Sequence, residues 1–426
     1  MSSILELEPD KTLLLDGPAS ATVSSGRVSV FGAEVSPGQR LVVRKGRRLP
    51  LEALELSKVS ITVGLGGSFS VVEGSPIPSS WRDVVEEALS LGSSAKLLVL
   101  GAVDVGKTSL CTFLVNEALK VGRSVGIIDA DVGQSDIGPP CTIGFAKVEK
   151  PTWDLSTLRA QHIFFFGDKT PSHLVGRALR GIKTMLEAAE RSGVDFLIVN
   201  TDGWVSGPEA VEYKRAVASI VEPDLVLALR RSDELDMIIK HMGEWEIRPL
   251  ETSPFVKERD RETRRELRTL GYRRYLNGAK VISVNLKWIE VEGELPGAGL
   301  RPSRERCATI SSFLGLEPLY CEEGHKKIFV ILDEEDEEPA AEAVSRLEQV
   351  LGKKVKILRK GFEEGTLVAL YDKGGAFLGI GIIIGIDYRK RTARIFTLAD
   401  EEEVAKLCVG RVRLNLDGTE IDAPLT

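Results

Sequence analysis

The chain has 426 residues, of which 43% are hydrophobic and 28% are charged, and its formal net charge is −7. These values exclude a disordered chain and a single small domain, and the length favours two or three domains. The acidic balance argues against a broad electrostatic grip on nucleic acid but leaves room for a local basic groove.

The cysteines and histidines show no spacing typical of a metal site or a disulfide framework. The five cysteines form no C-x-x-C pair and are odd in number, and the four histidines are scattered. Apolar runs stay shorter than the roughly 20 residues that span a bilayer, and the N-terminus lacks the features of a secretory signal. We therefore expect a cytoplasmic protein with reduced thiols, no zinc and no membrane contact.

Short alternating apolar runs fill residues 12–73, and Gly-bearing turns separate them. This pattern is typical of a small all-β domain. Pro76 and Pro78 then interrupt the pattern before a helical stretch at 81–91. We predict an N-terminal β domain at residues 1–80.

An apolar run at 96–100 leads directly into the loop G-A-V-D-V-G-K-T at 101–108. This is the Walker A pattern, in which glycines let successive N–H groups face phosphate oxygens and the following helix adds its positive end. We expect Lys107 to reach the β- and γ-phosphates and Thr108 to bind Mg²⁺ through its hydroxyl. The chain is thus predicted to use a nucleoside triphosphate. The predicted nucleotide-binding residues are Gly101, Asp104, Val105, Gly106, Lys107, Thr108 and Ser109.

Strand-like and helical segments alternate from residue 96 to about residue 286. Residues 124–129, 195–200 and 224–229 are strand-like, whereas 172–192 and 208–221 have helical periodicity. Such alternation predicts an α/β fold with a parallel sheet flanked by helices. We assign residues 81–288 to a central P-loop NTPase domain.

Two carboxylates, Asp129 and Asp131, end the strand that follows the Walker helix. Alternate residues of a strand share a face, so both point toward the nucleotide if the extended conformation continues. One can hold the water shell of Mg²⁺ while the other accepts a proton from an attacking hydroxyl. We assign Asp129 to the metal and Asp131 as the base, although the sequence does not distinguish the two roles.

Two loops at the expected carboxyl edge of the sheet are candidates for binding an acceptor, and their predicted substrate-binding residues are Gln134, Thr201 and Trp204. Gln134 opens a restricted loop that contains two prolines, and N-T-D-G-W at 200–204 ends a further apolar strand. Ligands gather at this edge of open α/β sheets. Trp204 can stack on a nucleobase. A tight connection at Gln134 and core packing of Trp204 are the alternatives.

Residues 257–274 form a strongly basic helical stretch in an otherwise acidic chain. Arg264 and Arg268 are four residues apart and share a helix face, so they can neutralise charge on a triphosphate. We predict a lid at residues 255–275 in which both arginines are catalytic. A surface helix with Glu–Arg pairs is the alternative.

The last third of the chain has a composition of its own. Several strand-like apolar runs and one helical segment at 337–351 predict a C-terminal β-rich or α+β domain at 289–426. The acidic run at 333–338 is expected to be a solvated loop.

The Walker loop, D-A-D-V-G-Q at 129–134, T-D-G-W at 201–204 and R-x-x-x-R at 264–268 follow one another along the chain. Together they resemble the polynucleotide 5′-hydroxyl kinase family, which includes archaeal RNA kinases and eukaryotic kinases of messenger, transfer and ribosomal RNA processing. The resemblance covers most of the chain and implies the same three-part plan. It also implies transfer of the γ-phosphate of ATP, with Mg²⁺, to the 5′-hydroxyl of RNA or DNA, and other RNA-processing proteins as partners.

Carried over by position, the resemblance implies a role for each matching side chain. In the family the N-terminal domain helps to hold the nucleotide base, but its contact residues find no match here. Asp202 stands where a small residue such as Ser is common in the family, which puts the substrate contacts there in doubt. The matching residues are Lys107 and Thr108 as phosphate and metal ligands, Asp131 as the base, Trp204 as the stacking residue, and Arg264 with Arg268 in the lid.

Three other function classes use the same nucleotide loop. A P-loop GTPase or regulatory ATPase is disfavoured, because R-R-S-D follows the strand at 224–229 where a GTPase carries N-K-x-D. A non-catalytic ATP-binding scaffold of an RNA-processing complex is disfavoured by the intact Lys107, Asp131 and lid arginines. A small-molecule kinase stays open, because Trp204 alone does not decide the acceptor.

Overall fold

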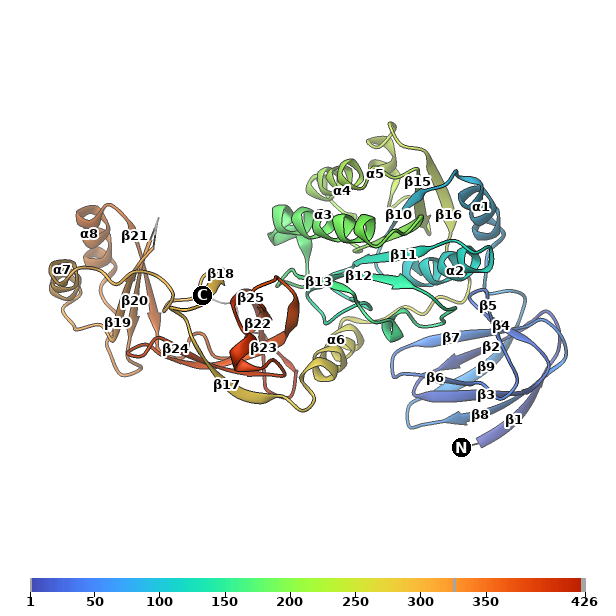
Figure 1. Ribbon diagram of the computed structural model, residues 1–426, viewed down its shortest axis with the longest axis horizontal. Helices are drawn as coiled ribbons and strands as arrows, with labels where there is room; N and C mark the ends of the chain where they lie inside the picture. Colours follow the sequence, from blue (N-terminus) through green and yellow to red (C-terminus); the bar gives the residue numbers. More distant parts are fainter. Residues whose placement is uncertain (1, 325–326, 423–426) are drawn as a thin grey trace. The chain divides into compact units, whose positions relative to one another are not determined.

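The computed structural model describes residues 2–324 and 327–422. The chain divides into two compact units, Met1–Gly271 and Tyr272–Thr426, and each is described by itself. The first unit contains the N-terminal β-rich segment and the central α/β segment, and the second contains the C-terminal sheets (Figure 1). The three-domain division at residues 80 and 288 stays a prediction.

Two antiparallel sheets pack against each other at the start of the first unit, which confirms the predicted all-β segment. One has the order β1-β8-β3-β6 and the other β5-β4-β7-β2-β9. Buried and exposed residues alternate along β3 and β8, and the buried side chains of both sheets share one core. The strands are β1 Ser2–Leu7, β2 Lys11–Asp16, β3 Ala19–Ser25, β4 Val28–Val30, β5 Ala33–Val35, β6 Arg40–Val43, β7 Arg48–Ala53, β8 Ser57–Val63 and β9 Ser68–Glu73.

A seven-stranded sheet with the order β13-β12-β11-β14-β10-β15-β16 forms the centre of the unit. Five adjacent strands are parallel, as predicted, but near one edge β12 runs antiparallel to both of its neighbours, β11 and β13, so the sheet is mixed. The strands are β10 Ala95–Gly101, β11 Val125–Ala130, β12 Thr142–Val148, β13 His162–Phe165, β14 Phe196–Thr201, β15 Leu225–Arg230 and β16 Ile247–Glu251.

Helices cover both faces of this sheet (Figure 1). Leu97 and Val99 of β10 pack toward α1 and α2, whereas Leu98 and Leu100 pack toward α3 and α4. Alternate residues of a buried strand thus serve two cores, which explains its continuous apolar sequence. The helices of this segment are α1 Ser79–Ser90, α2 Lys107–Lys120, α3 Val175–Arg191, α4 Pro208–Val221 and α5 Asp236–Lys240, with short 3₁₀ turns at Leu155–Thr157 and Pro171–His173. Helix α6, Arg261–Leu276, follows β16 and includes the boundary between the two units at Gly271.

The second unit is α+β, as predicted. One sheet has the order β17-β24-β23-β22-β25-β18, with β26 paired to β25, and the other has the order β19-β20-β21. Helices α7 and α8 pack on the smaller sheet around Leu347 and Ile328. The elements are β17 Lys280–Asn285, β18 Glu290–Glu292, α7 Arg304–Leu314, β19 Tyr320–Glu323, β20 Lys327–Leu332, α8 Ala341–Leu351, β21 Lys354–Arg359, β22 Thr366–Tyr371, β23 Phe377–Asp387, β24 Thr392–Thr397, a 3₁₀ turn at Glu401–Glu403, β25 Lys406–Leu414 and β26 Glu420–Ile421.

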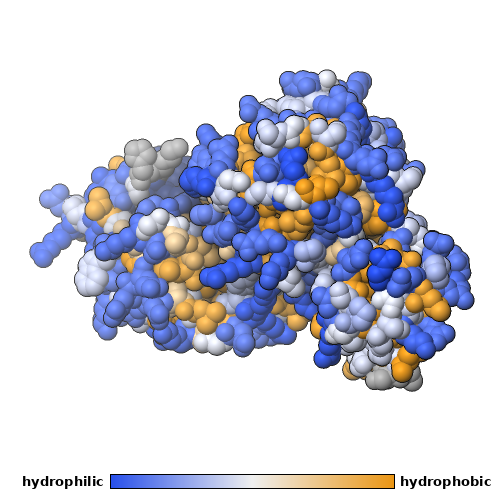
Figure 2. All heavy atoms as spheres, turned by 45° about the vertical axis from the view of Figure 1, so that its right-hand side comes forward, coloured by the Kyte–Doolittle hydropathy of each residue, from blue (hydrophilic) through white to orange (hydrophobic). Residues whose placement is uncertain are grey.

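The surface seen in Figure 2 is mainly hydrophilic, with separated apolar patches between the charged side chains. Exposed apolar side chains of this scattered kind are ordinary for a globular protein. Within the described ranges 2–324 and 327–422, no helix combines the length and the apolar character needed to cross a bilayer.

Candidate active site

The Walker loop joins β10 to α2 at the carboxyl end of the central sheet. Gly106 has φ 101°, and a Cβ at Gly101 would lie 2.8 Å from the carbonyl oxygen of Leu229, so glycine is required at both places. Gly106 also precedes α2 and supplies no side-chain cap. The first N–H groups of α2 can therefore bind phosphate oxygens.

Lys107 lies at the first turn of α2 and is only 5% exposed. Its Nζ donates to the carbonyl oxygens of Gly101 and Ala102, at 3.0 and 2.7 Å, so the cation lies over the loop. Thr108 and Ser109 line the same pocket, whereas Val105 is buried behind the loop. The Walker residues thus separate into those that face the pocket and those that support the loop.

The carboxylate of Asp129 is buried beneath the loop that follows β11. Its Oδ2 accepts hydrogen bonds from the N–H groups of Asp136 and Ile137, at 2.6 and 3.1 Å, and its Oδ1 accepts one from Asn200 at 3.0 Å. Burial and the nearby charge of Asp136 raise the pKa of Asp129, and the backbone N–H donors oppose that rise. Asp129 therefore holds the loop from beneath.

Asp131 lies in the pocket, because β11 ends at Ala130 and the chain turns there. Its Oδ1 accepts hydrogen bonds from Gly133 and Gln134, at 3.2 and 3.1 Å. The expectation that both carboxylates face the nucleotide is therefore wrong for Asp129, because the extended conformation ends between them. Burial raises the pKa of Asp131 while the charge of Lys107 lowers it, and the net direction is upward.

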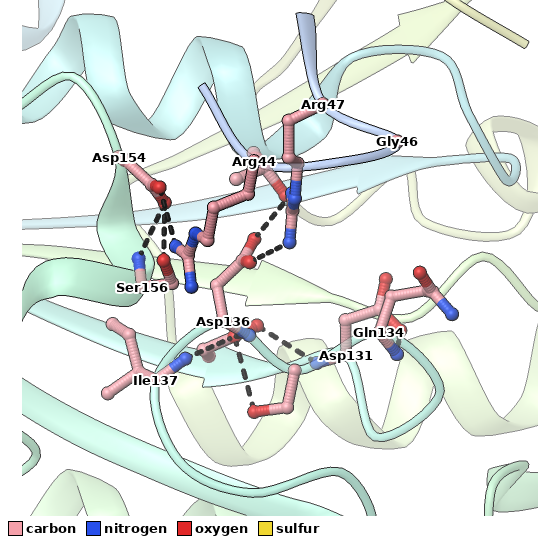
Figure 3. Close-up of polar contacts among 12 residues, drawn as sticks. Arg44, Gly46, Arg47, Asp131, Gln134, Asp136, Ile137, Asp154 and Ser156 are labelled. Atoms are coloured by element: carbon pink, nitrogen blue, oxygen red, sulfur yellow. Dashed lines mark hydrogen bonds and ion pairs between the residues drawn. The ribbon is translucent and has the colours of Figure 1, made fainter. Parts of the chain in front are cut away.

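Asp136 connects this loop to the N-terminal β domain through an ion pair that the sequence analysis missed. Arg47, between β6 and β7, approaches both oxygens of the buried Asp136, and Arg44 pairs with Asp154 at 2.6 Å (Figure 3). Burial alone would raise the pKa of Asp154, but the charges of Arg44 and Arg47 and the hydrogen bonds from Ser156 and Arg44 together outweigh it, so the pKa is lowered. The only sequence signal was the basic run R-K-G-R-R at 44–48 in an acidic chain.

The helix within the predicted lid segment begins later than expected. Asp260 accepts a hydrogen bond from the N–H of Thr263 at 2.6 Å and so caps α6, which starts at Arg261. Residues 257–260 therefore precede the helix, although the sequence predicted helix there.

Asp104 of the Walker loop connects the lid segment to the phosphate-binding loop. Its carboxylate accepts from the backbone N–H of Arg259 at 3.1 Å, and the guanidinium groups of Arg259 and Arg264 lie 3.4 and 3.1 Å away. Arg259 lines the pocket, which the sequence analysis missed, whereas the two predicted lid residues Arg264 and Arg268, one helical turn apart, both lie outside the lining. Gln134 also contacts the lid, because its side-chain amide donates to the carbonyl oxygen of Arg264 at 3.3 Å.

The two remaining candidates lie at the end of β14, outside the pocket lining. Thr201 is 1% exposed, and its hydroxyl donates to the carbonyl oxygen of Val99 at 2.8 Å, so this side chain is committed to the sheet. Trp204 is half-buried and stacks on Tyr213, with the ring centroids 5.5 Å apart. Trp204 is therefore not sealed in the core.

One pocket in the first unit collects most of these groups. Its P-loop side includes Asp104, Gly106, Lys107, Thr108, Ser109, Asp131 and Gln134. Its other side includes Arg44, Arg47 and Arg48 from the β domain, together with Lys257 and Arg259 from the lid segment. Cations from three parts of the chain thus converge on the phosphate-binding loop, an arrangement suited to a polyanion such as a nucleoside triphosphate.

A Mg²⁺ ion fits this site through a small number of protein oxygens. Among the described residues, no group of three or more His, Cys, Asp and Glu side chains gathers to hold a metal. Mg²⁺ bound with a nucleotide needs only one or two protein ligands, because phosphates and water supply the rest. The Thr108 hydroxyl lines the pocket and can supply one of them, whereas the predicted metal carboxylate of Asp129 lies outside the lining and already accepts hydrogen bonds from Asp136, Ile137 and Asn200.

The fold and the loop define a P-loop nucleotide-binding protein with a mixed central sheet. Residues 101–278 match the family described as mRNA cleavage and polyadenylation factor CLP1 P-loop. The chain is 32% identical over 347 residues to a polyribonucleotide 5′-hydroxyl-kinase of Pyrococcus abyssi, covering 81% of this chain and 95% of that protein. The chain belongs to the polyribonucleotide 5′-hydroxyl-kinase family, as the resemblance of its motifs predicted.

Two further comparisons concern a more distant relative and the fold. The chain is 28% identical over 302 residues to the polyribonucleotide 5′-hydroxyl-kinase Clp1 of Gallus gallus, covering 64% of this chain and 69% of that protein. The solved structure of a wild-type Clp1p–Pcf11p complex aligns with a TM-score of 0.67 at 14% identity, covering 97% of this chain and 98% of that chain. At this identity the structural likeness shows the fold alone.

Proposed function

We propose that this chain transfers the γ-phosphate of ATP to the 5′-hydroxyl end of a polyribonucleotide. The observation that carries the proposal is the pocket in which the Walker loop, Asp131 and cations from the β domain and the lid segment meet. The activity for which the relatives are named, polyribonucleotide 5′-hydroxyl kinase, supports the same reaction. An acidic chain suits it, since gripping one terminus neutralises few phosphates.

The side chains of the pocket divide the work of phosphoryl transfer. Lys107, released from the loop carbonyls, would bind the β- and γ-phosphates, and the first N–H groups of α2 would bind their oxygens. Asp131 would orient the 5′-hydroxyl and accept its proton, a role helped by a pKa closer to neutral than that of an ordinary carboxyl. Mg²⁺, when bound, would neutralise charge on the phosphates from Thr108.

Arginines of the lid segment would meet the charge that develops on the transferred group. Arg264 keeps its predicted role, and we add Arg259, because both lie within 3.4 Å of Asp104 in the Walker loop. Moving either guanidinium from this carboxylate to a phosphate exchanges one anionic partner for another, so the step requires little net desolvation. Arg268 stays a proposed lid residue whose contact would need movement of α6.

The acceptor would lie beyond Asp131. Gln134 lines the pocket beside the base, and Trp204 presents a half-buried ring at the end of β14. We propose that Gln134 contacts the acceptor terminus and that Trp204 stacks on its first base. Thr201 would act through the sheet rather than through substrate, since its hydroxyl is bonded to β10.

The test is a labelling assay with [γ-³²P]ATP and Mg²⁺ on four acceptors: a 5′-hydroxyl RNA, the same RNA already 5′-phosphorylated, a 5′-hydroxyl DNA and a free nucleoside. We expect label on the 5′-hydroxyl RNA and none on its phosphorylated form. Label on the nucleoside alone would instead indicate a small-molecule kinase. Tight ATP binding without transfer to any acceptor would refute the proposal in favour of a scaffold.

A further inference from the structure

The turn that carries Trp204 is anchored by an ion pair in the interior of the first unit. Lys214 of α4 is completely buried, and Asp202 is only 4% exposed. The Nζ of Lys214 lies 3.0 Å from the Oδ2 of Asp202 and also donates to the carbonyl oxygen of Asp202 at 2.9 Å. One lysine thus fixes both the side chain and the backbone of the residue that starts the turn.

The same ion pair reaches the tryptophan directly. The other carboxylate oxygen of Asp202 accepts the backbone N–H of Trp204 at 2.9 Å. The indole stacks on Tyr213, with ring planes 25° apart, and Tyr213 immediately precedes Lys214 on α4. Two successive residues of one helix therefore hold the backbone and one ring face of Trp204.

The turn also rests on the phosphate-binding loop. A Cβ at Gly203 would lie 2.7 Å from the backbone nitrogen of Val103 and 2.9 Å from its Cα. The turn that carries Trp204 and the Walker loop are therefore in backbone contact. A displacement of the turn changes the place of Trp204 relative to the nucleotide.

The burial of the Lys214–Asp202 ion pair indicates that the pair serves to position the turn rather than to stabilise the fold. Removing two charges from water is unfavourable, and a well-packed apolar pair is often equally stable or more so. Burial lowers the pKa of Lys214, and the charge of Asp202 opposes this. The pair fixes the orientation of the Trp204 turn, since three polar contacts converge on these three residues.

We propose that Lys214 and Asp202 are positioning residues for the polynucleotide acceptor, which hold Trp204 with one face on Tyr213 and the other toward a base of the incoming strand. The inference rests on the proposed function and adds residues that the motif comparison left without a role. In this chain an acidic residue is needed to pair with the buried lysine.

The test compares steady-state kinetics of the full chain with Lys214→Met, Asp202→Asn, the double variant and Trp204→Ala. Asn keeps an oxygen for the Trp204 N–H, and Met keeps the length of the lysine stem, so the double variant is a neutral pair of similar shape. We expect Lys214→Met to raise the KM for a 5′-hydroxyl RNA at least about fivefold, as loss of one stacked base would, and to leave the KM for ATP unchanged. The double variant should recover part of this loss.

A coupling measurement separates positioning from a general structural effect. In the Trp204→Ala background, adding Lys214→Met should raise the acceptor KM no further, because the side chain that it positions is gone. Lys183→Met, at an exposed site of α3, is the matched control and should leave every constant unchanged. Equal changes in both KM values, or full additivity with Trp204→Ala, would overturn the proposal.

Two outcomes keep this inference distinct from the proposed function. If Trp204→Ala raises the acceptor KM but neither Asp202→Asn nor Lys214→Met does, the positioning role is wrong while the kinase assignment stands. If the wild-type chain transfers no phosphate, the kinase proposal fails. Fluorescence anisotropy with a labelled 5′-hydroxyl RNA then still measures whether Asp202→Asn weakens binding as Trp204→Ala does. Asp202→Asn also decides the matter if Lys214→Met does not fold.

Discussion

Replacing Gly203 with Ala should damage the site through one misplaced methyl group. The new Cβ would lie 2.5 Å from Cγ2 of Val103, 2.7 Å from its backbone nitrogen and 2.9 Å from its Cα. Real Cβ atoms do not approach neighbours this closely. The Val103 side chain is 46% exposed and can rotate away, but its nitrogen and Cα belong to the Walker loop and cannot.

The free-energy cost of Gly203→Ala depends on how far the backbone of the Trp204 turn must move away from the backbone of the Walker loop. Overpacking a filled site typically costs about 1–3 kcal/mol. If this whole free-energy cost arises from displacement of the Trp204 turn relative to the Walker loop, kcat/KM for the acceptor drops about 5- to 150-fold. Because the clash involves both segments, we expect the KM values for ATP and for RNA to rise together.

The assay is steady-state phosphorylation of a 5′-hydroxyl RNA, combined with thermal unfolding. Gly176→Ala is the matched control, because a Cβ there meets no atom within 4 Å, and the residue lies in α3. This control should keep full activity and gain up to about 1 kcal/mol of stability. Wild-type kinetics for Gly203→Ala would refute the backbone contact between the two segments.

Three further changes test the pocket. Lys107→Ala should abolish detectable transfer and weaken ATP binding in calorimetry, whereas Lys183→Ala on the exposed face of α3 should do neither. Asp131→Asn should lower kcat by about 10²- to 10⁴-fold while ATP still binds; near-normal turnover would reject the base assignment. Because the pKa of Asp131 is raised, the wild-type rate should increase with pH through a midpoint higher than the ordinary pKa of an aspartate, and a rate independent of pH on the acidic side would contradict this. A fully buried ion pair loses about 3–5 kcal/mol when one partner is removed, and since Arg47 keeps 26% exposure we expect Arg47→Met to lower the free energy of unfolding in urea by about 1–3 kcal/mol. The exposed Arg27→Met control should lose less than about 1 kcal/mol, and equal losses for the two variants would count against a buried pair.

The parts of the fold that the sequence predicted are those that local patterns determine. The apolar run before Gly101 and the glycine at position 106 have one structural solution, so the Walker strand, loop and helix are where the pattern put them. The helix at Pro208–Val221 begins and ends as predicted, because its periodicity is long and Pro208 marks its first turn. The antiparallel direction of β12 was missed, because periodicity does not encode the direction of neighbouring strands.

The parts of the site that escaped prediction depend on contacts across the chain. Arg47 and Asp136 are 89 residues apart, and nothing near either residue identifies its partner. The different environments of Asp129 and Asp131 follow from a turn one residue after Ala130, and a strand pattern does not locate such a turn to that precision. The start of α6 could have been predicted more easily, since an Asp directly before a helical pattern, as at Asp260, is a recognisable N-cap.

The arginines between β6 and β7 have a consequence for how this protein can be divided. A fragment beginning at residue 81 would retain every motif of the nucleotide loop, yet it would lose the cations that neutralise Asp136 and Asp154. Two acidic groups would then face an incoming triphosphate without compensation, and like charges repel most strongly where water is scarce. The β domain thus supplies the positive charges that balance the acidic residues of the pocket. A chimera that takes its β domain from a relative should therefore be active only if it also carries the acidic partners that match the arginines of that domain.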